Sequence, residues 1–300
     1  MAMASNLALH SIHLIGVPSG LGGNDPRSGD APAALLRDHV PRVLRENGVI
    51  VSAEILAKPP HLLSSKDNRY RLVAGVCEHL ARATARLVAS RRFFGVLGGD
   101  HSCAIGTWAG VARSTPSLGL IWIDAHLDSH TPATSPSSNP HGMPVAVLLG
   151  QGNSNLLEVC GNRPVLEPSR VCLIGVRSYE AAERAFLEHL GVRVYYIDEV
   201  IKRGLKAVVK EAVARVAKSV TALGISIDLD ALDPQDAPGV ALPVTNGLRW
   251  AELRGALQEV AKHPALIGVE VTEYTAYRDK NNKTARLVGE LLATLARRLA

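Results

Sequence analysis

The chain has 300 residues, of which 47% are hydrophobic and 20% are charged, so it holds ample apolar material for a globular core. Its 33 Lys and Arg against 28 Asp and Glu give a formal net charge of +5. The basic residues form no long run, and aromatic residues make up only 4% of the chain. A nucleic-acid-binding protein typically has a basic stripe or aromatic stacking platforms, so we expect no nucleic-acid partner.

Cysteine usage and the N-terminal segment bear on the cellular compartment. Cys77, Cys103, Cys160 and Cys172 are widely spaced and form no CxxC pair, which is typical of reduced, mostly buried thiols. Residues 1–18 have neither the basic start nor the apolar stretch of a signal peptide, and no apolar run reaches the length of a membrane span. These features predict a cytoplasmic protein with no membrane anchor.

Apolar runs of strand length alternate with longer stretches of helical period, and this pattern predicts an α/β fold whose parallel sheet has helices on both faces. The predicted strands are residues 13–17, 49–55, 93–97, 118–123, 171–174, 192–197, 223–227 and 265–271. The predicted helices are residues 32–46, 70–89, 104–112, 179–190, 205–219, 250–262 and 284–300. No repeat or long linker divides the sequence, so we expect one domain over residues 1–300.

Three polar clusters each follow a predicted strand. The strand 118–123 is followed by DAHLD (residues 124–128), the strand 223–227 by DLD (228–230), and the strand 93–97 by GGDHS (98–102). In an open parallel sheet, ligands bind beyond the carboxyl ends of the strands. Each cluster alone is weak, because DxD is more often a turn and GGDHS can be a capped helix start. Together, at matching strand ends, they predict a metal site.

The charges in these clusters indicate which metal and how many ions. The candidate ligands are His101, Asp124, His126, Asp128, Asp228 and Asp230. Four crowded carboxylates would repel one another, and two divalent cations would neutralise them. Hard carboxylates with one imidazole per ion and no thiolate suit Mn²⁺ better than structural zinc. Two ions about 3.5–4 Å apart can share a water and lower its pKa, so we predict a hydrolytic centre with two Mn²⁺ per chain.

The motifs LGGDHSCAIGTWAG (residues 97–110), IWIDAHLD (121–128) and SIDLDALDPQDAPGVALPVTNG (226–247) resemble those of the arginase/agmatinase, or ureohydrolase, family over essentially the whole chain. The resemblance implies a three-layer αβα fold with a single doubly wound, mostly parallel sheet. It implies a homo-oligomer, trimer or hexamer, and manganese bound by the same six residues. Asp124 and Asp228 would bridge the two ions, and Asp128 would hydrogen-bond the metal-bound hydroxide.

The resemblance also assigns residues in the loop 129–144 (SHTPATSPSSNPHGMP), which is similar to the arginase version of this segment. There Ser137 and Asn139 would bind the substrate carboxylate, with Ser135 as a further donor. A carboxylate removed from water needs several such fixed donors. His141 would relay protons, since an imidazole titrates near neutral pH.

Three acidic residues further along the chain match the family's substrate-binding positions. Glu180 and Glu183, in RSYEAAER, match the acids that bind the α-ammonium, although acids also favour an exposed first helical turn for electrostatic reasons. Glu273, in GVEVTEY, matches the acid that binds the guanidinium, which a carboxylate can hold with two hydrogen bonds.

The sequence departs from the family pattern at positions that concern the substrate. His130 stands where arginases commonly carry an asparagine that helps to hold the carboxylate; an imidazole can still donate there, so His130 stays in the substrate-binding set. Leu242 stands where a small polar residue is usual, and Thr275-Ala276 replaces the usual Asn/Ser-Pro. None of these departures falls on a metal-ligand position.

The resemblance implies manganese-dependent hydrolysis of L-arginine to L-ornithine and urea by a metal-bridging hydroxide. Another ureohydrolase activity, on agmatine, guanidinobutyrate or a related small guanidino compound, is the nearest alternative. A catalytically silent metal-binding homologue that acts through a partner subunit is a third.

Overall fold

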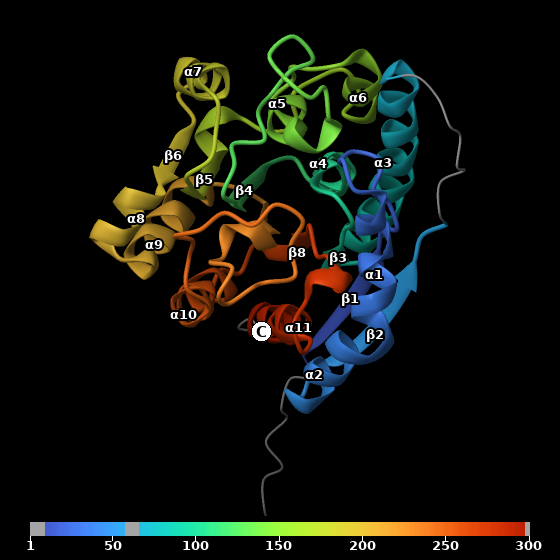
Figure 1. Ribbon diagram of the computed structural model, residues 1–300, viewed down its shortest axis with the longest axis vertical. Coiled ribbons are helices and arrows are strands. Elements are labelled where there is room, and N and C mark those ends of the chain that lie inside the picture. The colour runs from blue at the N-terminus through green and yellow to red at the C-terminus, as the bar shows by residue number, and fades with distance from the viewer. Residues whose placement is uncertain (1–9, 58–65, 298–300) are drawn as a thin grey trace, which may run out of the picture.

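The fold is built on one sheet of eight strands, seen in a computed structural model that describes residues 10–57 and 66–297. The strands lie in the order β2-β1-β3-β8-β7-β4-β5-β6, and all of the paired strands are parallel (Figure 1). They are β1 Ser11–Gly16, β2 Ile50–Ile55, β3 Phe94–Leu97, β4 Leu118–Ile123, β5 Val171–Val176, β6 Arg193–Tyr196, β7 Ala222–Asp228 and β8 Leu266–Thr272.

Each strand expected from the sequence is present, with small shifts at its ends. The sheet is parallel throughout rather than mostly parallel. One boundary was wrong: Ile197, placed in the strand 192–197, begins a helix instead. Tyr196 is the N-cap of that helix, and a short apolar run does not show where a strand gives way to a helix.

The helices cover the expected stretches, and three short ones were missed. They are α1 Ala31–Ala34, α2 Val40–Glu46, α3 Lys66–Ala89, α4 Ala104–Ser114, α5 Pro144–Leu148, α6 Ser154–Val159, α7 Ala181–Leu190, α8 Ile197–Arg203, α9 Leu205–Val216, α10 Trp250–Ala261 and α11 Lys283–Ala296. The missed ones, α5, α6 and α8, have too few turns for a helical period to stand out. The last three residues of the predicted helix 284–300 lie outside the described residues.

Two hydrophobic cores lie on opposite faces of the sheet. In β4, Ile121 and Ile123 face one core, and Leu120 and Trp122 face the other, as the alternation of side chains along a strand requires. Helices α2, α9, α10 and α11 cover the first face, and α3 to α7 cover the second (Figure 1). The sheet is therefore the middle of three layers, as the family resemblance implied. Among the described residues, no helix is long and apolar enough to cross a membrane.

The topology brings the three polar clusters to one edge. β8 and β7 separate β3 from β4 in the sheet although β3 and β4 are consecutive in the chain, so the strand order reverses at this point. The carboxyl ends of β3, β7 and β4 therefore open on a common crevice, the usual place for a ligand in such a sheet.

The packing of β7 on α4 gives a test of the core. A Cβ on Gly224 would come within 2.0 Å of the fully buried Trp108 ring. Gly224→Ala should therefore lower the free energy of unfolding by about 1–3 kcal/mol, the usual effect of overpacking a core. Gly255→Ala in α10, where a Cβ would meet nothing within 4 Å, should instead stabilise the protein by roughly 0.5–1 kcal/mol. Denaturant titration measures the free energy of unfolding of both variants. Equal changes in the two would contradict this packing of β7 on α4.

Candidate active site

The turn after β4 holds its acidic side chains in place with backbone donors. Asp124 accepts from the backbone N–H of His126 (2.7 Å) with Oδ1 and from the indole N–H of Trp122 (2.9 Å) with Oδ2. Asp128 has a φ of +46° and Glu273, after β8, a φ of +63°, a region that non-glycine residues seldom occupy. Such backbone strain is concentrated at functional sites, where the surrounding structure imposes it.

The first cluster surrounds the imidazole of His101. Its Nδ1 atom lies 3.3 Å from an Asp124 oxygen, 3.0 Å from Asp128 Oδ2 and 3.1 Å from Asp228 Oδ2. The side chains of His101 and Asp124 are almost completely buried. Three carboxylate oxygens thus converge on one buried nitrogen.

The second cluster adjoins the first and shares Asp124 with it. His126 Nδ1 lies 3.4 Å from Asp124 Oδ1 and 3.2 Å from Asp230 Oδ2. Asp124 therefore contributes Oδ2 to the first cluster and Oδ1 to the second. Asp228 contributes Oδ2 to the first, and its Oδ1 accepts from the backbone N–H of Asp230 (2.9 Å).

These clusters fit divalent cations. His101 Nδ1 and Asp128 Oδ2 are buried and form no hydrogen bond with any described residue, although they lie 3.0 Å apart. Unsatisfied polar atoms are rare in protein interiors unless they serve an ion or a function. Separations of this size suit atoms that share one small ion, whose bonds to oxygen and nitrogen are about 2.0–2.2 Å long.

Without cations, protons carry the compensating charge. Burial lowers the pKa of His126, but Asp230 and Asp124 outweigh it and hold this pKa far above its ordinary value. The pKa of His101 is raised in the same way by three aspartates. Burial, together with Asp124, raises the pKa of Asp128 to about 6. Cations that bind here must therefore displace protons.

A buried relay fixes the orientation of the His101 ring. The Ser226 hydroxyl donates to Glu270 Oε2 (2.8 Å), so its oxygen is left to accept from His101 Nε2–H (3.0 Å). Nδ1 is then the ring atom that would give its lone pair to a cation in the first cluster once the proton on it is displaced. Trp122 stacks on the same ring with centroids 4.2 Å apart.

Arg177 ties the second cluster to β5. All five of its N–H donors reach backbone carbonyls, at distances of 2.8–3.2 Å, in three segments: Gly175, Asp230 with Ala231, and Val244 with Thr245. A guanidinium has five such donors, so this one is fully used. Arg177 therefore holds both the candidate ligand Asp230 and the returning loop.

Glu273 and His141 stand beside the clusters. Glu273 Oε1 accepts from the backbone N–H of His101 (2.9 Å) and lies 3.2 Å from His141 Nδ1. Burial lowers the pKa of His141, but the Glu273 carboxylate outweighs this effect and raises it to about 9. The imidazole is therefore protonated at neutral pH in the cation-free protein.

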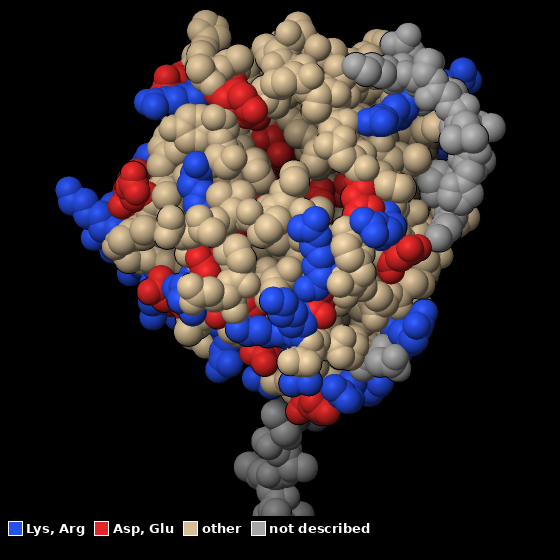
Figure 2. Space-filling view, viewed as in Figure 1, with Lys and Arg blue, Asp and Glu red and all other residues tan. Residues whose placement is uncertain are grey.

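One cavity joins the clusters to the predicted substrate-binding residues. It is lined by His101, His126, Asp128, His130, Ser135, Pro136, Ser137, Asn139, His141, Gly142, Glu180, Glu183, Asp228, Asp230, Leu242 and Glu273. Six of these side chains are carboxylates and four are imidazoles, and the described lining includes no lysine or arginine. Figure 2 shows acidic side chains deep in a hollow of this face. Such a cavity favours a cationic ligand.

The comparisons with known proteins agree with this geometry. The model of the arginase family matches residues 10–297. The arginase of Bacillus caldovelox is 39% identical over 95% of this chain and 97% of its own, and that of Brevibacillus brevis is 36% identical over the same shares. The crystal structure of the Bacillus caldovelox arginase superimposes with a TM-score of 0.89 at 38% identity, covering 96% of this chain and 98% of the other.

The chain belongs to the arginase family. Members of this family are hydrolases of guanidino compounds and depend on a binuclear metal centre, and the acidic and histidine clusters supply groups that can bind metal. The predicted metal ligands and the predicted substrate-binding residues meet in one place, since all but the fully buried Asp124 line the cavity.

Two substrate-binding candidates already form several hydrogen bonds within the protein, which the family resemblance did not indicate. The Asn139 side chain accepts from Arg69 (2.6 Å) and donates to Asn24 (2.8 Å). Glu183 accepts from the backbone N–H groups of Ser129 and Glu180, each at 3.1 Å, and forms a capping box with Glu180 at the start of α7. Glu180 and Glu183 therefore begin helix α7, as one interpretation of the sequence held, and they also line the cavity, as the binding-site interpretation requires.

Sequence reasoning missed the residues that support this arginase-family site. Arg177 and Ser226 carry no pattern of their own that indicates their contacts. Glu270 offered a signal, since it is the one charged residue in the strand LIGVEVT and is fully buried. A lone acid in a buried strand requires hydrogen-bond partners, which here are Thr107, Ser226 and Cys103.

The raised pKa values of His101 and His126 predict how the site takes up Mn²⁺. Their protons are retained at neutral pH, so ions must displace them, and the apparent affinity for Mn²⁺ should rise with pH between about 6.5 and 8.5. Calorimetric titration of cation-free protein in two buffers of different ionisation enthalpy should show protons released. Binding heats that do not depend on the buffer would contradict the proton-filled clusters.

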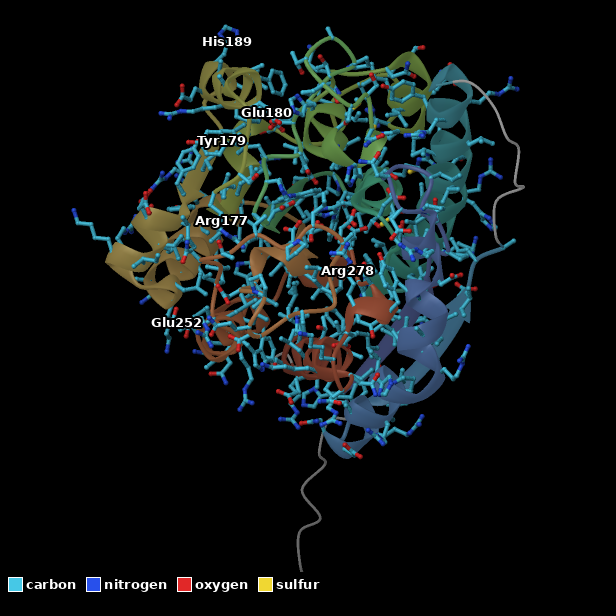
Figure 3. All side chains as sticks on the ribbon, viewed as in Figure 1. Arg177, Tyr179, Glu180, His189, Glu252 and Arg278 are labelled. Carbon is cyan, nitrogen blue, oxygen red and sulfur yellow. The ribbon has the colours of Figure 1, made fainter. Side chains whose placement is uncertain are left out.

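Arg177→Lys should loosen the second cluster, because a single ammonium cannot reach carbonyls in three segments. We expect at least about a tenfold loss of Mn²⁺ affinity for one ion of the pair, the order of effect seen when groups that orient metal ligands are replaced. The matched control is Arg278→Lys, at an exposed arginine labelled with Arg177 in Figure 3. Equal Mn²⁺ affinities in the two variants would show that Arg177 does not orient Asp230.

Proposed function

We propose that this protein catalyses the manganese-dependent hydrolysis of L-arginine to L-ornithine and urea. The observation that carries the proposal is the acidic cavity, which joins two cation-binding clusters at one end to hydroxyl donors at the other. L-Arginine has a guanidinium that suits the end with the clusters. Its ammonium and carboxylate suit the other end, which has both carboxylates and hydroxyl donors. The curated relatives that match nearly the whole chain bear the name arginase.

The six sequence-predicted residues would hold two Mn²⁺ ions. His101, Asp128 and Asp228 would hold the first ion, and His126 and Asp230 would hold the second; Asp124 has one oxygen in each cluster. Asp228 is our second bridging candidate. When bound, such ions supply the positive charge that makes water nucleophilic at neutral pH.

The protein's own groups orient the guanidinium and move protons. Glu273 holds the guanidinium by hydrogen bonds and turns its carbon toward the clusters. Asp128 would hold the first ion through Oδ2, which lies 3.0 Å from His101 Nδ1, and its other oxygen would accept a hydrogen bond from the attacking water. His141, with Nδ1–H donating to Glu273, which stabilises the charged imidazole, would give the proton on Nε2 to the departing amine.

The remote end of the cavity receives the amino-acid group. Ser135 Oγ accepts from the backbone N–H of Ser138 (2.9 Å), and Ser137 Oγ accepts from that of Asn139 (3.2 Å). The two hydroxyls lie 3.4 Å apart, so at least one of their hydrogens is left to donate to a carboxylate. Asn139 and His130 stand beside them, and Glu180 and Glu183 lie on the α7 side.

A different guanidino compound, such as agmatine or guanidinobutyrate, is the second candidate substrate. It is favoured by the hydrogen bonds that Asn139 and Glu183 form within the protein. These bonds weaken the recognition of a substrate that carries both an α-ammonium and a carboxylate. We also propose a cytoplasmic homo-oligomer, trimer or hexamer, for either substrate. The four cysteines are free and buried, which suits a reducing compartment.

Urea release measured with Mn²⁺ across L-arginine, agmatine and 4-guanidinobutyrate tests the substrate. We expect the highest kcat/KM with L-arginine: agmatine has no carboxylate for the Ser135 and Ser137 hydroxyls, and the carboxylate of 4-guanidinobutyrate is one carbon nearer the guanidinium and reaches them less well. Agmatine hydrolysed at least as efficiently would contradict the arginine assignment and leave a ureohydrolase. No urea from any of the three would favour the silent homologue.

Asp128→Asn tests the reaction itself. Asparagine matches aspartate in size and tolerates the positive φ, so the fold should be kept, and removal of a buried charge should leave the stability of the cation-free protein unchanged or raised. We expect urea production to fall by at least about 10²–10³-fold, as when a group that acts on the reacting atoms is lost. Activity within tenfold of the wild type, with the thermal melt unchanged, would refute the proposed role.

A further inference from the structure

The imidazole of His130 is buried at the remote end of the cavity, between the loop after Asp128 and the start of α7. Only 7% of the residue is exposed. Its Nε2 atom lies 3.0 Å from Glu180 Oε2 and 3.4 Å from Glu183 Oε2. The backbone N–H of His130 donates to the carbonyl oxygen of Gly142 (3.0 Å), and this hydrogen bond fixes the position of the His130 backbone.

Neighbouring hydrogen bonds set the direction of the His130 contacts. The Thr134 hydroxyl oxygen accepts from the backbone N–H of Thr131 (2.9 Å) and lies 3.1 Å from His130 Nδ1. The Thr131 carbonyl and hydroxyl oxygens, both at 3.4 Å, are the longer alternatives for the hydroxyl hydrogen, so this hydrogen goes to Nδ1. His130 then carries its proton on Nε2 and donates it to Glu180, even as a neutral imidazole.

The acidic pair is therefore largely occupied by the protein. Both Glu183 oxygens accept backbone N–H groups, and Glu180 Oε2 accepts from His130. A substrate ammonium that reaches this pair has to displace or share the imidazole. A substrate carboxylate meets a weaker competitor, because the Ser135 and Ser137 hydroxyls have only each other, at 3.4 Å, as acceptors among the described residues, and at most one of their two hydrogens is used there.

We propose that His130 takes the place of a substrate ammonium at Glu180 and Glu183, and that it thereby sets the substrate range of the enzyme. The site then recognises guanidino compounds chiefly through their carboxylate, and it accepts ω-guanidino acids that lack the α-ammonium. This inference rests on the proposed function, namely that the cavity binds a guanidino compound with its polar end toward α7.

Three substrates of equal chain length separate the two ends. L-Arginine carries both the ammonium and the carboxylate, agmatine only the ammonium, and 5-guanidinopentanoate only the carboxylate. In His130→Asn, whose shorter side chain withdraws from Glu180, kcat/KM for L-arginine and agmatine should rise at least about tenfold relative to 5-guanidinopentanoate. That factor is the usual worth of one hydrogen bond to a charged group.

Two further variants guard the result. Thr134→Val removes the hydroxyl that sets the His130 proton on Nε2, and it should shift the same ratios in the same direction by a smaller factor. His189→Asn makes the same chemical change on α7 at an exposed site, and Figure 3 shows His189 pointing away from the molecule while Glu180 lies on the side toward the loop. This control should leave all three ratios unchanged.

Other patterns would overturn the proposal. If His130→Asn changed kcat/KM equally for all three substrates, His130 would support the site in general. If kcat/KM changed only for L-arginine and 5-guanidinopentanoate, which carry a carboxylate, His130 would belong to carboxylate binding. If the wild type hydrolyses none of them, calorimetry on the Mn²⁺-loaded protein with L-ornithine, putrescine and 5-aminopentanoate makes the same comparison without catalysis. L-Ornithine and putrescine carry an ammonium at the end that faces α7, and 5-aminopentanoate carries only a carboxylate there. Stronger binding of the first two in His130→Asn, relative to 5-aminopentanoate, would support the proposal although the proposed reaction had failed; unchanged ratios would overturn it.

Discussion

The mutual repulsion of four aspartates at the carboxyl edge of the sheet is the constraint on which this site depends. Asp124, Asp128, Asp228 and Asp230 are all buried, and burial weakens the screening that would let such charges coexist. The fold therefore requires positive charge at this point, from protons on two imidazoles or from cations. The strands beneath are largely apolar, with Glu270 in β8 as a buried exception, so the compensating charge has to lie in the clusters.

The protein keeps these acidic side chains close together through hydrogen bonds from groups outside the clusters. Backbone N–H groups hold Asp124, Asp228 and Glu273, so their oxygens keep their directions whether or not a ligand is present. Arg177 does the same for the loop that bears Asp230, through carbonyls rather than carboxylates. Its positive charge thus stays near the aspartates without using an oxygen that the clusters need.

The sheet, and the gathering of the acidic and histidine side chains at its carboxyl edge, could be predicted well from the sequence, because both depend on local pattern. Apolar runs of strand length and DxD or GGDH groups directly after them can be found along one strand. The supporting contacts could not be predicted in this way: Arg69 meets Asn139, and His130 meets Glu180, across 70 and 50 residues of chain. Such pairs exist only because the loop 129–144 folds back between α3 and α7. Glu270 lies between these cases, since its burial could be expected but its partners could not.

The sharing of Asp124 has a thermodynamic consequence. Its carboxylate has one oxygen in each cluster and is already fixed by hydrogen bonds from His126 and Trp122, so a change of charge at one cluster is felt directly at the other. A proton or cation gained at one cluster would therefore alter the affinity of the other, and this coupling would be reciprocal.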